Sequence, residues 1–290
     1  MQDLSAEGKS STAGTWIPKG PSPAESPHMS EDFARVYELT GNRVTAPIAV
    51  EALRRVAPLR AGVRVLDIAA GAGALSIPAA HSGASVLAVD IAPGMVKLLS
   101  ERLAPFPNAE ARVMDGQALA IDDHSFDLAF SIIGVGIFSN WRAGLREQSR
   151  VLRPGGKACV ATWKTLPGGG PFTVMARAMR SVFPEQTPPV PPDGFVTLSH
   201  PARFATELQA AGFVDVEVAE VDAVWQGPAG HAHLDELHKL HRYMAPYAAL
   251  DDNDRRKVDK AILQIVEDYA VSGQIRIVSP VLIAVASTRS

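Results

Sequence analysis

Hydrophobic residues in the first half of the chain form short, nearly continuous runs that alternate with segments of helical periodicity. The apolar runs predict buried strands at residues 63–69, 85–90, 109–115, 126–133 and 157–163. Between them, apolar residues recur every three or four positions and predict helices at about 73–82, 93–104 and 141–152. Strands that are apolar on both faces are typical of parallel sheets. The pattern therefore predicts an α/β fold with a mostly parallel, doubly wound sheet.

The two ends of the chain have different patterns. Ser30, which precedes two acidic residues, predicts the start of a helix that ends at "TGN", residues 40–42. Thr45 predicts the cap of a second helix that continues to Val56. After a helix that begins at 201 and is closed by Gly212, residues 214–221 alternate with period two and residues 277–288 are largely apolar. Both segments predict strands.

Two long segments interrupt this framework, at about residues 166–195 and 222–273. The first contains clusters of glycine and proline, and the second contains two helical stretches. Insertions of this length inside a compact domain usually serve as lids or binding elements. We therefore expect one domain over 29–290, in which residues 222–273 fold over the carboxyl end of the sheet.

Composition narrows the classes of partner. The formal net charge of the 290 residues is −3, and this argues against a nucleic-acid partner. Cys159 is the single cysteine, so neither a disulfide framework nor a four-thiolate metal site can form. This cysteine usage predicts a cytoplasmic protein, and no apolar run reaches the length of a membrane span. Residues 1–28, rich in Ser, Gly and Pro, predict a flexible tail that the fold does not need.

A small-residue loop follows the first predicted strand, in the stretch "VLDIAAGAGALS". Gly71 and Gly73 let the backbone approach a ligand closely, and the helix start offers unpaired N–H groups. Dinucleotides and S-adenosylmethionine both fit such a loop. The dinucleotide fingerprint has a third glycine where this chain has Ser76. Asp90, at the end of the second strand, suits the ribose hydroxyls of either ligand.

The rest of the pattern favours the second ligand. The stretches "DIAAGAG", "VDIAPGMV", "VMDGQAL" and "LRPGGK", in this order, resemble the class I S-adenosylmethionine-dependent methyltransferases over residues 63–163. The resemblance is to the small-molecule branch that includes ubiquinone and menaquinone biosynthesis enzymes. It implies a seven-stranded Rossmann-like sheet with helical lid insertions and S-adenosylmethionine as cofactor. Ala69 departs from the family pattern, which often has glycine at this position.

The resemblance also implies which residues contact the cofactor. Four residues of the loop would line its methionine end, and Asp90 would accept hydrogen bonds from the ribose. Two apolar side chains would pack on the adenine, and three residues after the third strand would contact its edge. Two residues at the end of the fourth strand would lie beside the transferable methyl group. In chain order, the complete set is Asp67, Ala69, Gly71, Gly73, Asp90, Ile91, Met95, Asp115, Gly116, Gln117, Ser131 and Ile132.

Some of these residues have an ordinary structural interpretation as well. The two glycines could serve helix packing, the two later aspartates could cap helices, and Met95 could belong to the core. Tyr37 and Arg43, upstream of the loop, could reach the methionine carboxylate or the acceptor, although a tyrosine on an apolar helix face is more often a core residue.

The stretch "HAHLDELHKLHRYMAPY" contains four histidines. His231, Asp235 and His238 fall on one face of a helix, with His241 close to its continuation. This face could hold a general base with its orienting acid, or a metal ion. The plain alternative is a solvated helix that packs through its leucines. We expect no metal, and we take His238, His241 and Tyr243 as candidate catalytic contacts to the acceptor.

The reaction that these expectations describe needs little covalent chemistry from the protein. A sulfonium methyl group is already activated, so the chain has to hold a nucleophile in line and exclude water. Methionine and aromatic side chains in the two insertions suit a small apolar or aromatic acceptor. Two alternatives are a regulatory protein that binds the cofactor without turnover, and a nicotinamide-dependent reductase.

Overall fold

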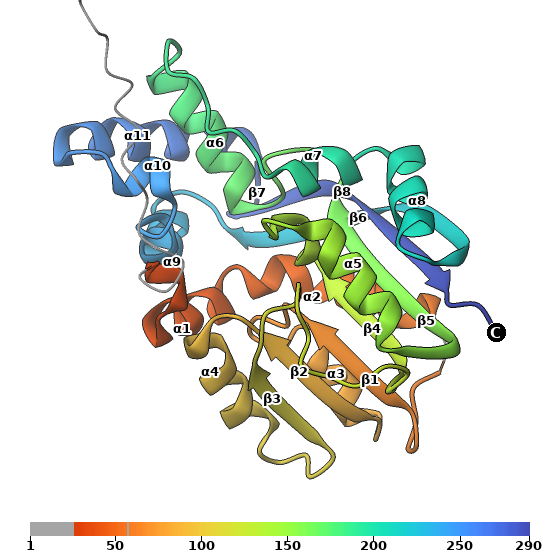
Figure 1. Cartoon of the computed structure of the whole chain (residues 1–290). Helices are drawn as coiled ribbons and strands as arrows, with labels where there is room; N and C mark the ends of the chain where they lie inside the picture. The colour runs from red at the N-terminus through yellow and green to blue at the C-terminus, as the bar shows by residue number, and fades with distance from the viewer. Residues whose placement is uncertain (1–25, 57) are drawn as a thin grey trace, which may run out of the picture.

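The computed structural model describes residues 26–56 and 58–290, and it contains one mixed sheet (Figure 1). The strands lie in the order β3-β2-β1-β4-β5-β8-β6, and the short β7 pairs with β8. The pairs among β3, β2, β1, β4 and β5 are parallel, whereas β8 is antiparallel to β5 and β6. The strands are β1 Arg64–Ile68, β2 Ser85–Asp90, β3 Ala109–Val113, β4 Phe126–Ile132, β5 Leu152–Trp163, β6 Val214–Pro228, β7 Ala270–Val271 and β8 Gln274–Ser287.

The mostly parallel, doubly wound sheet is thereby confirmed, and each predicted strand is present. The helices, with the two short 3-10 helices named η2 and η3, are η2 Pro27–Met29, α1 Glu31–Leu39, α2 Asn42–Arg55, α3 Ser76–His81, α4 Pro93–Leu103, η3 Val135–Ile137, α5 Trp141–Arg150, α6 Pro171–Val182, α7 Asp193–Leu198, α8 Pro201–Ala210, α9 His231–His241, α10 Ala245–Ala248 and α11 Asp252–Asp268.

Two helix starts differ from the prediction. Helix α2 begins at Asn42, so Thr45 is not its cap; the Thr45 hydroxyl lies inside the helix and donates to the carbonyl of Asn42. Helix α3 begins at Ser76 rather than Gly73. Gly71 and Gly73 both have positive φ angles, which no helical residue adopts, so the loop is longer and the helix shorter than expected.

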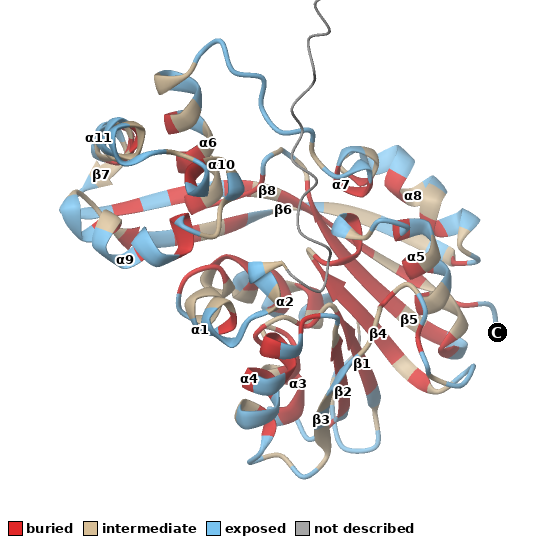
Figure 2. Ribbon diagram, turned by 60° about the vertical axis from the view of Figure 1, so that its left-hand side comes forward, coloured by how far each residue is buried: buried red, intermediate tan, exposed pale blue. Residues whose placement is uncertain are grey.

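Both faces of the sheet are covered, and the side chains of each strand alternate between the two sides. On β1, Val65 packs into a cluster with residues of α2, α3 and α4, whereas Leu66 packs into a second cluster with residues of α5, α7 and α8. Figure 2 shows the buried residues along the central strands, with α3 and α4 on one side and α5 and α8 on the other. This two-sided burial explains why the central strands are almost continuously apolar.

The second insertion is carried by a two-stranded arm. β5 ends at Trp163, which pairs with Val281 of β8, but β8 begins seven residues earlier, at Gln274. Over that length β8 pairs with residues 222–228 of β6. The arm therefore projects beyond the carboxyl edge of the parallel strands. The predicted insertion over 222–273 is partly wrong, because its first seven residues are strand and its helices occupy only 231–268.

The helices of the insertion share the core of the domain. Leu237 and Leu240 of α9 and Ile262 of α11 belong to the same buried cluster as Ile48 of α2 and Met175 of α6. The two predicted lid segments pack on each other through α6 and α11, and they share one buried cluster with α2.

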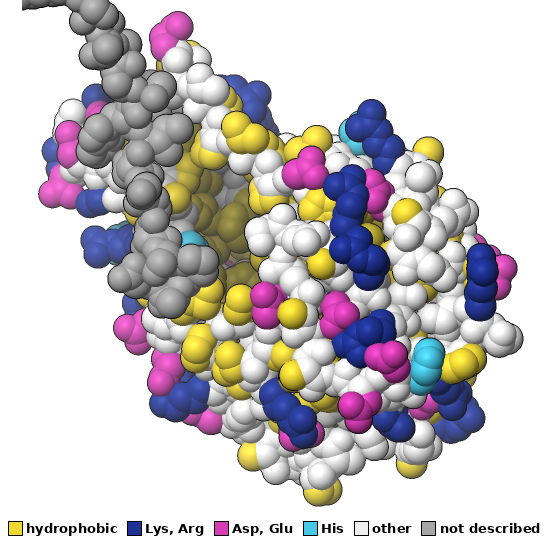
Figure 3. Space-filling view, viewed as in Figure 1, with side chains coloured by type: hydrophobic (Ala, Val, Ile, Leu, Met, Phe, Trp, Pro, Cys, Tyr) yellow, Lys and Arg dark blue, Asp and Glu magenta, His cyan; other side chains and the backbone are white. Residues whose placement is uncertain are grey.

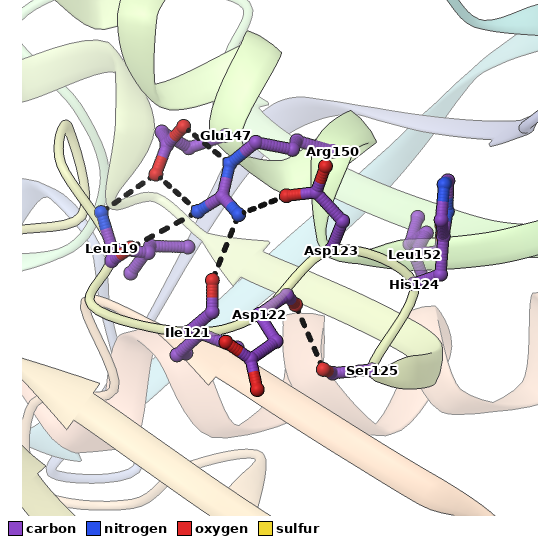
Figure 4. A network of polar contacts seen from close by, with 9 residues as sticks. All are labelled: Leu119, Ile121, Asp122, Asp123, His124, Ser125, Glu147, Arg150 and Leu152. Atoms are coloured by element: carbon purple, nitrogen blue, oxygen red, sulfur yellow. Dashed lines mark hydrogen bonds and ion pairs between the residues drawn. The ribbon is translucent and has the colours of Figure 1, made fainter.

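Arg150, at the end of α5, organises the loop that leads from β3 to β4 (Figure 4). Its guanidinium donates to the carbonyls of Leu119 (3.0 Å) and Ile121 (2.7 Å) and to the carboxylates of Asp123 (2.6 Å) and Glu147. Glu147 also accepts a hydrogen bond from the backbone N–H of Leu119 at 2.7 Å. The pKa of Glu147 is lowered, mainly by its hydrogen bond to Arg150.

We expect Arg150→Ala to lower the free energy of unfolding by roughly 2–3 kcal/mol, because it removes charged hydrogen bonds that are only partly exposed to solvent. The melting temperature should fall by roughly 4–10 °C in a domain of this size. Arg146→Ala, at an exposed position of the same helix, is the matched control. Equal melting temperatures for the two variants would show that the Arg150 network contributes no stability.

The predicted tail is described only in part. Residues 1–25 lie outside the described residues. Residues 26–28 do not belong to a flexible tail, since Ser26 caps η2 and Nε2 of His28 lies 3.0 Å from the carbonyl oxygen of Tyr243. Within the described ranges, none of the helices is both long and apolar enough to cross a membrane.

Candidate functional site

A small cavity opens at the carboxyl end of β1, beside the glycine-rich loop. It lies where the strand order reverses between β1 and β4, the position at which open α/β sheets bind ligands. Its volume is about 30 Å³, so it admits only a small group at the end of a larger ligand. The lining residues are Tyr37, Asn42, Thr45, Asp67, Ala69, Ala70, Gly71, Ala74, Leu75 and Ile132.

A larger groove of about 260 Å³ lies between α2 and β6. Its walls are formed by residues of the ranges 47–54 and 221–223, and none of them is a predicted site residue. Glu51, Arg54 and Asp222 are its charged residues. Volume alone therefore does not identify the functional site, and the smaller cavity is the one that gathers the predicted residues.

The loop is shaped by three residues with left-handed backbone angles. Ala69, Gly71 and Gly73 have φ angles of 58°, 52° and 89°. A Cβ at Gly71 would make only an ordinary contact, 3.7 Å from Cε1 of Tyr37, whereas a Cβ at Gly73 would lie 2.5 Å from Cδ1 of Leu99. Gly71 therefore borders the cavity, and Gly73 permits the loop to pack against α4. Ala69 holds a conformation that is costly for a residue with a side chain.

Asp90, the last residue of β2, organises the other side of the loop. Its carboxylate accepts hydrogen bonds from the N–H groups of Gly71 at 2.8 Å and Ala92 at 2.9 Å. Burial raises the pKa of Asp90, and these two hydrogen bonds oppose that effect. Each carboxylate oxygen can accept a second hydrogen bond. Asp90 can therefore hold the loop and a ligand hydroxyl at once.

Two apolar residues follow Asp90, and they differ in accessibility. The side chain of Ile91 is 47% exposed, so it offers an apolar surface beside the carboxylate. Met95 is only 5% exposed and is buried in a cluster with Ala34, against which Phe33 packs. Helix α1 thus encloses Met95, which has the environment of a core residue.

Asp67, inside the end of β1, is a buried carboxyl group. The hydroxyl of Ser76 donates to its Oδ2 at 2.5 Å. Burial raises the pKa of Asp67 to about 7; the Ser76 hydrogen bond opposes this shift and the charge of Asp90 adds to it. A cationic group in the cavity would favour the ionised carboxylate.

We expect binding of S-adenosylhomocysteine, which carries an ammonium group, to strengthen as pH rises toward 7. Below a pKa of about 7 the carboxyl group has to lose a proton to receive the cation, so the affinity should fall by about fivefold between pH 7 and pH 6. Asp67→Asn should give weaker binding with a flat profile. Calorimetry over this range is the test, and a flat profile for the native protein would contradict the role of Asp67.

In the ligand-free protein, the raised pKa of Asp67 has the opposite consequence. The neutral carboxyl group contributes stability that is complete below its ordinary pKa and is lost as pH rises to about 7. Asp67→Asn should therefore be more stable than the native protein at pH 8, and the difference should vanish toward pH 4. This comparison also shows whether the variant is folded.

Asp115, Gly116 and Gln117 form a tight turn after β3. Oδ1 of Asp115 accepts a hydrogen bond from the N–H of Gln117 at 2.9 Å, and Oε1 of Gln117 accepts one from the N–H of Asn140 at 2.6 Å. A Cβ at Gly116 would lie 2.7 Å from the ring of Phe138. The turn is therefore fixed against the start of α5.

The end of β4 contributes one residue to the cavity. Ile132 lines it, whereas Ser131 is buried and its Oγ accepts a hydrogen bond from the N–H of Val135 at 3.0 Å. A Cβ at Gly134 would lie 2.5 Å from the Cβ of Ala69. The turn after β4 thus packs directly on the strained residue of the loop.

Helices α1 and α2 supply cavity residues that the sequence analysis missed. Asn42 and Thr45 line the cavity together with Tyr37, whose pKa is raised by burial. A Cβ at Gly41 would lie 2.4 Å from the Tyr37 ring, so Gly41 makes room for it. The break at "TGN" is the feature of the sequence that could have indicated these cavity residues, since the turn there directs the start of α2 toward the loop. Arg43 does not line this cavity.

The candidate catalytic residues of α9 and its surroundings are separated. His238 is exposed, as are His231 and Asp235, so the face that carries the predicted base and acid lies in solvent. Tyr243 is half-buried and packs on Phe33, with ring centroids 4.9 Å apart. Among the described residues, no group of three or more metal-ligand side chains is gathered.

His241 is buried, and it belongs to a row of rings that includes a histidine the sequence analysis did not select. His233 lies between Trp225 and His241, with centroid distances of 5.6 and 6.5 Å, and His241 lies 5.6 Å from Tyr247. Within the described residues, the ring nitrogens of His233 and His241 have no hydrogen-bond partner. His233 and His241 lie four residues before and after Leu237, so helical periodicity places both on the buried leucine face, and this spacing is the signal that could have identified them.

Burial keeps both imidazoles neutral. It lowers the pKa of His241 to about 3 and lowers that of His233, near which the carbonyl of Pro228 lies without hydrogen-bonding geometry. A neutral imidazole has one nitrogen that can accept a proton. Of the three predicted catalytic residues, His241 is therefore the one whose ring is buried and unpartnered among the described residues.

The face of the molecule in Figure 3 has a hollow between the helices of the insertion and the body of the domain. Hydrophobic side chains lie at its floor and along its rim. Trp225 of the arm is buried within the cluster that also contains Met175 and Tyr247. The hollow is thus an apolar recess beside the carboxyl ends of the strands.

The chain is similar to known methyltransferases. A family model described as a methyltransferase domain matches residues 65–156. The demethylmenaquinone methyltransferase of Mycolicibacterium gilvum is 31% identical over 206 residues, which cover 67% of this chain and 88% of that protein. An uncharacterised protein of Mycobacterium tuberculosis is 29% identical over 248 residues, which cover 82% of this chain and 86% of that protein.

A solved structure has the same fold. Phosphoethanolamine N-methyltransferase 2 of Haemonchus contortus, in complex with phosphomonomethylethanolamine and S-adenosylhomocysteine, superposes with a TM-score of 0.57 at 18% sequence identity. The match covers 91% of this chain but only 58% of that enzyme, so the chain spans a little over half of its length.

Proposed function

Because the chain belongs to the class I S-adenosylmethionine-dependent methyltransferases, we propose that it methylates a small apolar or aromatic acceptor held by the helical insertion. The observation that carries this proposal is the position of the cavity. Asp67, Gly71 and Asp90 gather at the carboxyl ends of β1 and β2, and the arm of β6 and β8 projects from the same edge of the sheet. The cofactor and the acceptor would therefore meet there.

The residues present suit S-adenosylmethionine. Asp90 would accept hydrogen bonds from the ribose, and the exposed Ile91 would pack on the adenine, whose edge would reach the turn at Asp115–Gln117. The buried Asp67 would face the ammonium end, where Tyr37 also lines the cavity. When bound, the cofactor supplies an activated methyl group on a sulfonium. Gly73 and Met95 support the site through packing.

The chain itself contributes position and a dry environment. Ile132 and the turn after β4 border the cavity, and Ser131 fixes that turn through its hydrogen bond to Val135. The helices of the insertion close the hollow on the other side. Alignment of two reactants in this way accounts for much of the rate of a displacement reaction, and exclusion of water prevents hydrolysis.

The character of the hollow supports the choice of acceptor. Hydrophobic side chains lie at its floor and along its rim, and the arm and the insertion bring the rings of Trp225, His233, His241 and Tyr247 together. Such surroundings favour a flat or apolar molecule over a phosphorylated amine. The names of several relatives, including that of Mycolicibacterium gilvum, indicate that they act on a quinone. A quinol-like or phenolic acceptor is consistent with both observations.

A phenolic acceptor carries a proton that has to leave when the oxygen is methylated. His241 is the residue proposed to accept it, since its ring is buried and has an unpartnered nitrogen among the described residues. Burial lowers the pKa of His241 to about 3, so it would take the proton only as the bond to the methyl group forms and makes the phenol oxygen strongly acidic. His233, beside it, offers a second neutral ring. His238 and Tyr243 remain as secondary candidates, and their surroundings favour them less.

Ligand binding to the cofactor-loaded protein tests the acceptor class. In calorimetry with saturating S-adenosylhomocysteine, a soluble naphthol should bind and phosphoethanolamine should not. The matched comparison uses His241→Leu, which should bind the naphthol in the same experiment but, with S-adenosylmethionine in place of S-adenosylhomocysteine, methylate it about a hundredfold more slowly. Tighter binding of phosphoethanolamine than of the naphthol would contradict the proposed acceptor.

A further inference from the structure

Arg43 joins the start of α2 to the insertion by three contacts. One guanidinium nitrogen forms an ion pair with Glu236 of α9, and the other donates to the carbonyl of Gln226 on the arm. Its Cζ also lies 5.4 Å from the centre of the Trp225 ring. A single side chain of α2 therefore contacts both the strand that carries the insertion and its first helix.

The same helical turn also faces the cofactor cavity. Asn42 and Thr45, on either side of Arg43 in the sequence, line the cavity together with Tyr37 of α1. Arg43 points the other way, to α9 and β6. One turn of helix thus presents polar side chains to the cavity and a cation to the insertion.

The arm is well packed where Arg43 meets it. Trp225 is 1% exposed, and a Cβ at Gly170 would lie 2.9 Å from its Cγ and 3.2 Å from Val44. A shift of α2 would therefore be passed to Trp225 through packed atoms, and to α9 through the ion pair. Tightly packed elements transmit displacement in this way because they do not compress.

The ion pair contributes little to global stability. The side chains of Arg43 and Glu236 are 39% and 33% exposed, and pairs in such positions are worth little to the folded state. Their arrangement fixes the distance between two elements, so their removal should change the position of α9 and leave the domain folded. This makes the pair suitable for substitution.

We propose that Arg43 is a positioning residue that couples occupancy of the cofactor cavity to the position of the insertion. The proposal rests on the proposed function, since it takes the cavity as the binding site of the cofactor. A ligand that contacts Asn42 and Thr45 restricts the first turn of α2, and Arg43 then holds Glu236 and the arm in place. Because coupling between two sites is reciprocal, an ordered insertion also favours the bound cofactor.

Hydrogen–deuterium exchange of the full chain tests this coupling without an acceptor. Saturating S-adenosylhomocysteine should slow exchange of the α9 amides, residues 231–241, by about threefold or more in the native protein. In Arg43→Ala and in Glu236→Gln, the α9 amides should show no change on addition of the ligand. The affinity for S-adenosylhomocysteine should stay within about threefold of native, because neither side chain lines the cavity.

Two controls make the result specific. Lys239→Ala, at an exposed position of α9, should behave as the native protein. The charge exchange Arg43→Glu with Glu236→Arg should recover part of the slowed exchange, which a purely structural role of Arg43 would not predict. Native-like slowing of α9 exchange in Arg43→Ala would overturn the coupling. Failure of the native protein to bind S-adenosylhomocysteine would instead overturn the proposed function.

Discussion

Asp90→Ala should weaken S-adenosylmethionine by at least tenfold. The carboxylate is proposed to accept hydrogen bonds from ribose hydroxyls, and each charge-assisted hydrogen bond is worth about 1.5–3 kcal/mol before relaxation. A loss of only about 1.4 kcal/mol already corresponds to tenfold in the dissociation constant. The same substitution removes the acceptor of the Gly71 N–H, so the loop that borders the cavity should also loosen.

Calorimetry with the native protein, Asp90→Ala and Asp122→Ala measures this effect. Asp122 lies in the loop before β4, and its exposed carboxylate makes none of the contacts drawn in Figure 4. Asp122→Ala should bind as the native protein does. Native affinity in a folded Asp90→Ala protein would remove Asp90 from the site.

His241→Leu should lower the rate of methyl transfer to a phenolic acceptor by about a hundredfold, the usual range for loss of a general base. The same variant should be more stable than the native protein by about 1–2 kcal/mol, because a buried imidazole without hydrogen-bond partners among the described residues is replaced by a hydrocarbon. A loss of activity combined with a gain in stability is typical of residues that are retained for function.

Two control substitutions are chosen at positions where the side chain lies outside the row of buried rings. His238→Leu, on the solvent face of α9, and Tyr243→Phe, against Phe33, should keep the native rate within about threefold. Thermal unfolding and turnover measured on the same preparations separate the two effects. A native rate in His241→Leu would show that the acceptor loses its proton elsewhere or carries none.

The central strands and the loop after β1 could be predicted because the residues of each short segment carry the signal for its structure. Strands such as β4, buried on both faces, have no polar alternation, and the loop after β1 needs residues that tolerate positive φ. The arm was harder to predict. Asp222, Gln226 and Pro228 interrupt the apolar pattern of β6, so its end reads as part of the insertion. Only its pairing with β8 makes it a strand.

The residues of the site also fall into those that the sequence predicts and those that depend on tertiary packing. Asp67, Gly71 and Asp90 follow directly from their positions at the ends of strands, and the structure gathers them around one loop. Asn42 belongs to the first turn of α2 and lines the cavity because the cap of this helix is Gly41, four residues before the predicted cap Thr45. The spacing of His233 from Leu237 places it on the buried face of α9, but its contact with the ring of Trp225 depends on the packing of α9 against the arm, which no pattern within α9 encodes.

Transfer of a labelled methyl group to a panel of small acceptors tests the central claim most directly. The panel includes phenols, quinols, amines and thiols, with the native protein and Asp90→Ala assayed at limiting S-adenosylmethionine. The account predicts that the native protein labels at least one phenolic or quinol acceptor, and that the Asp90→Ala protein does so at least tenfold more slowly. Binding of the cofactor without label in any acceptor, or equal rates for the two proteins, would contradict it.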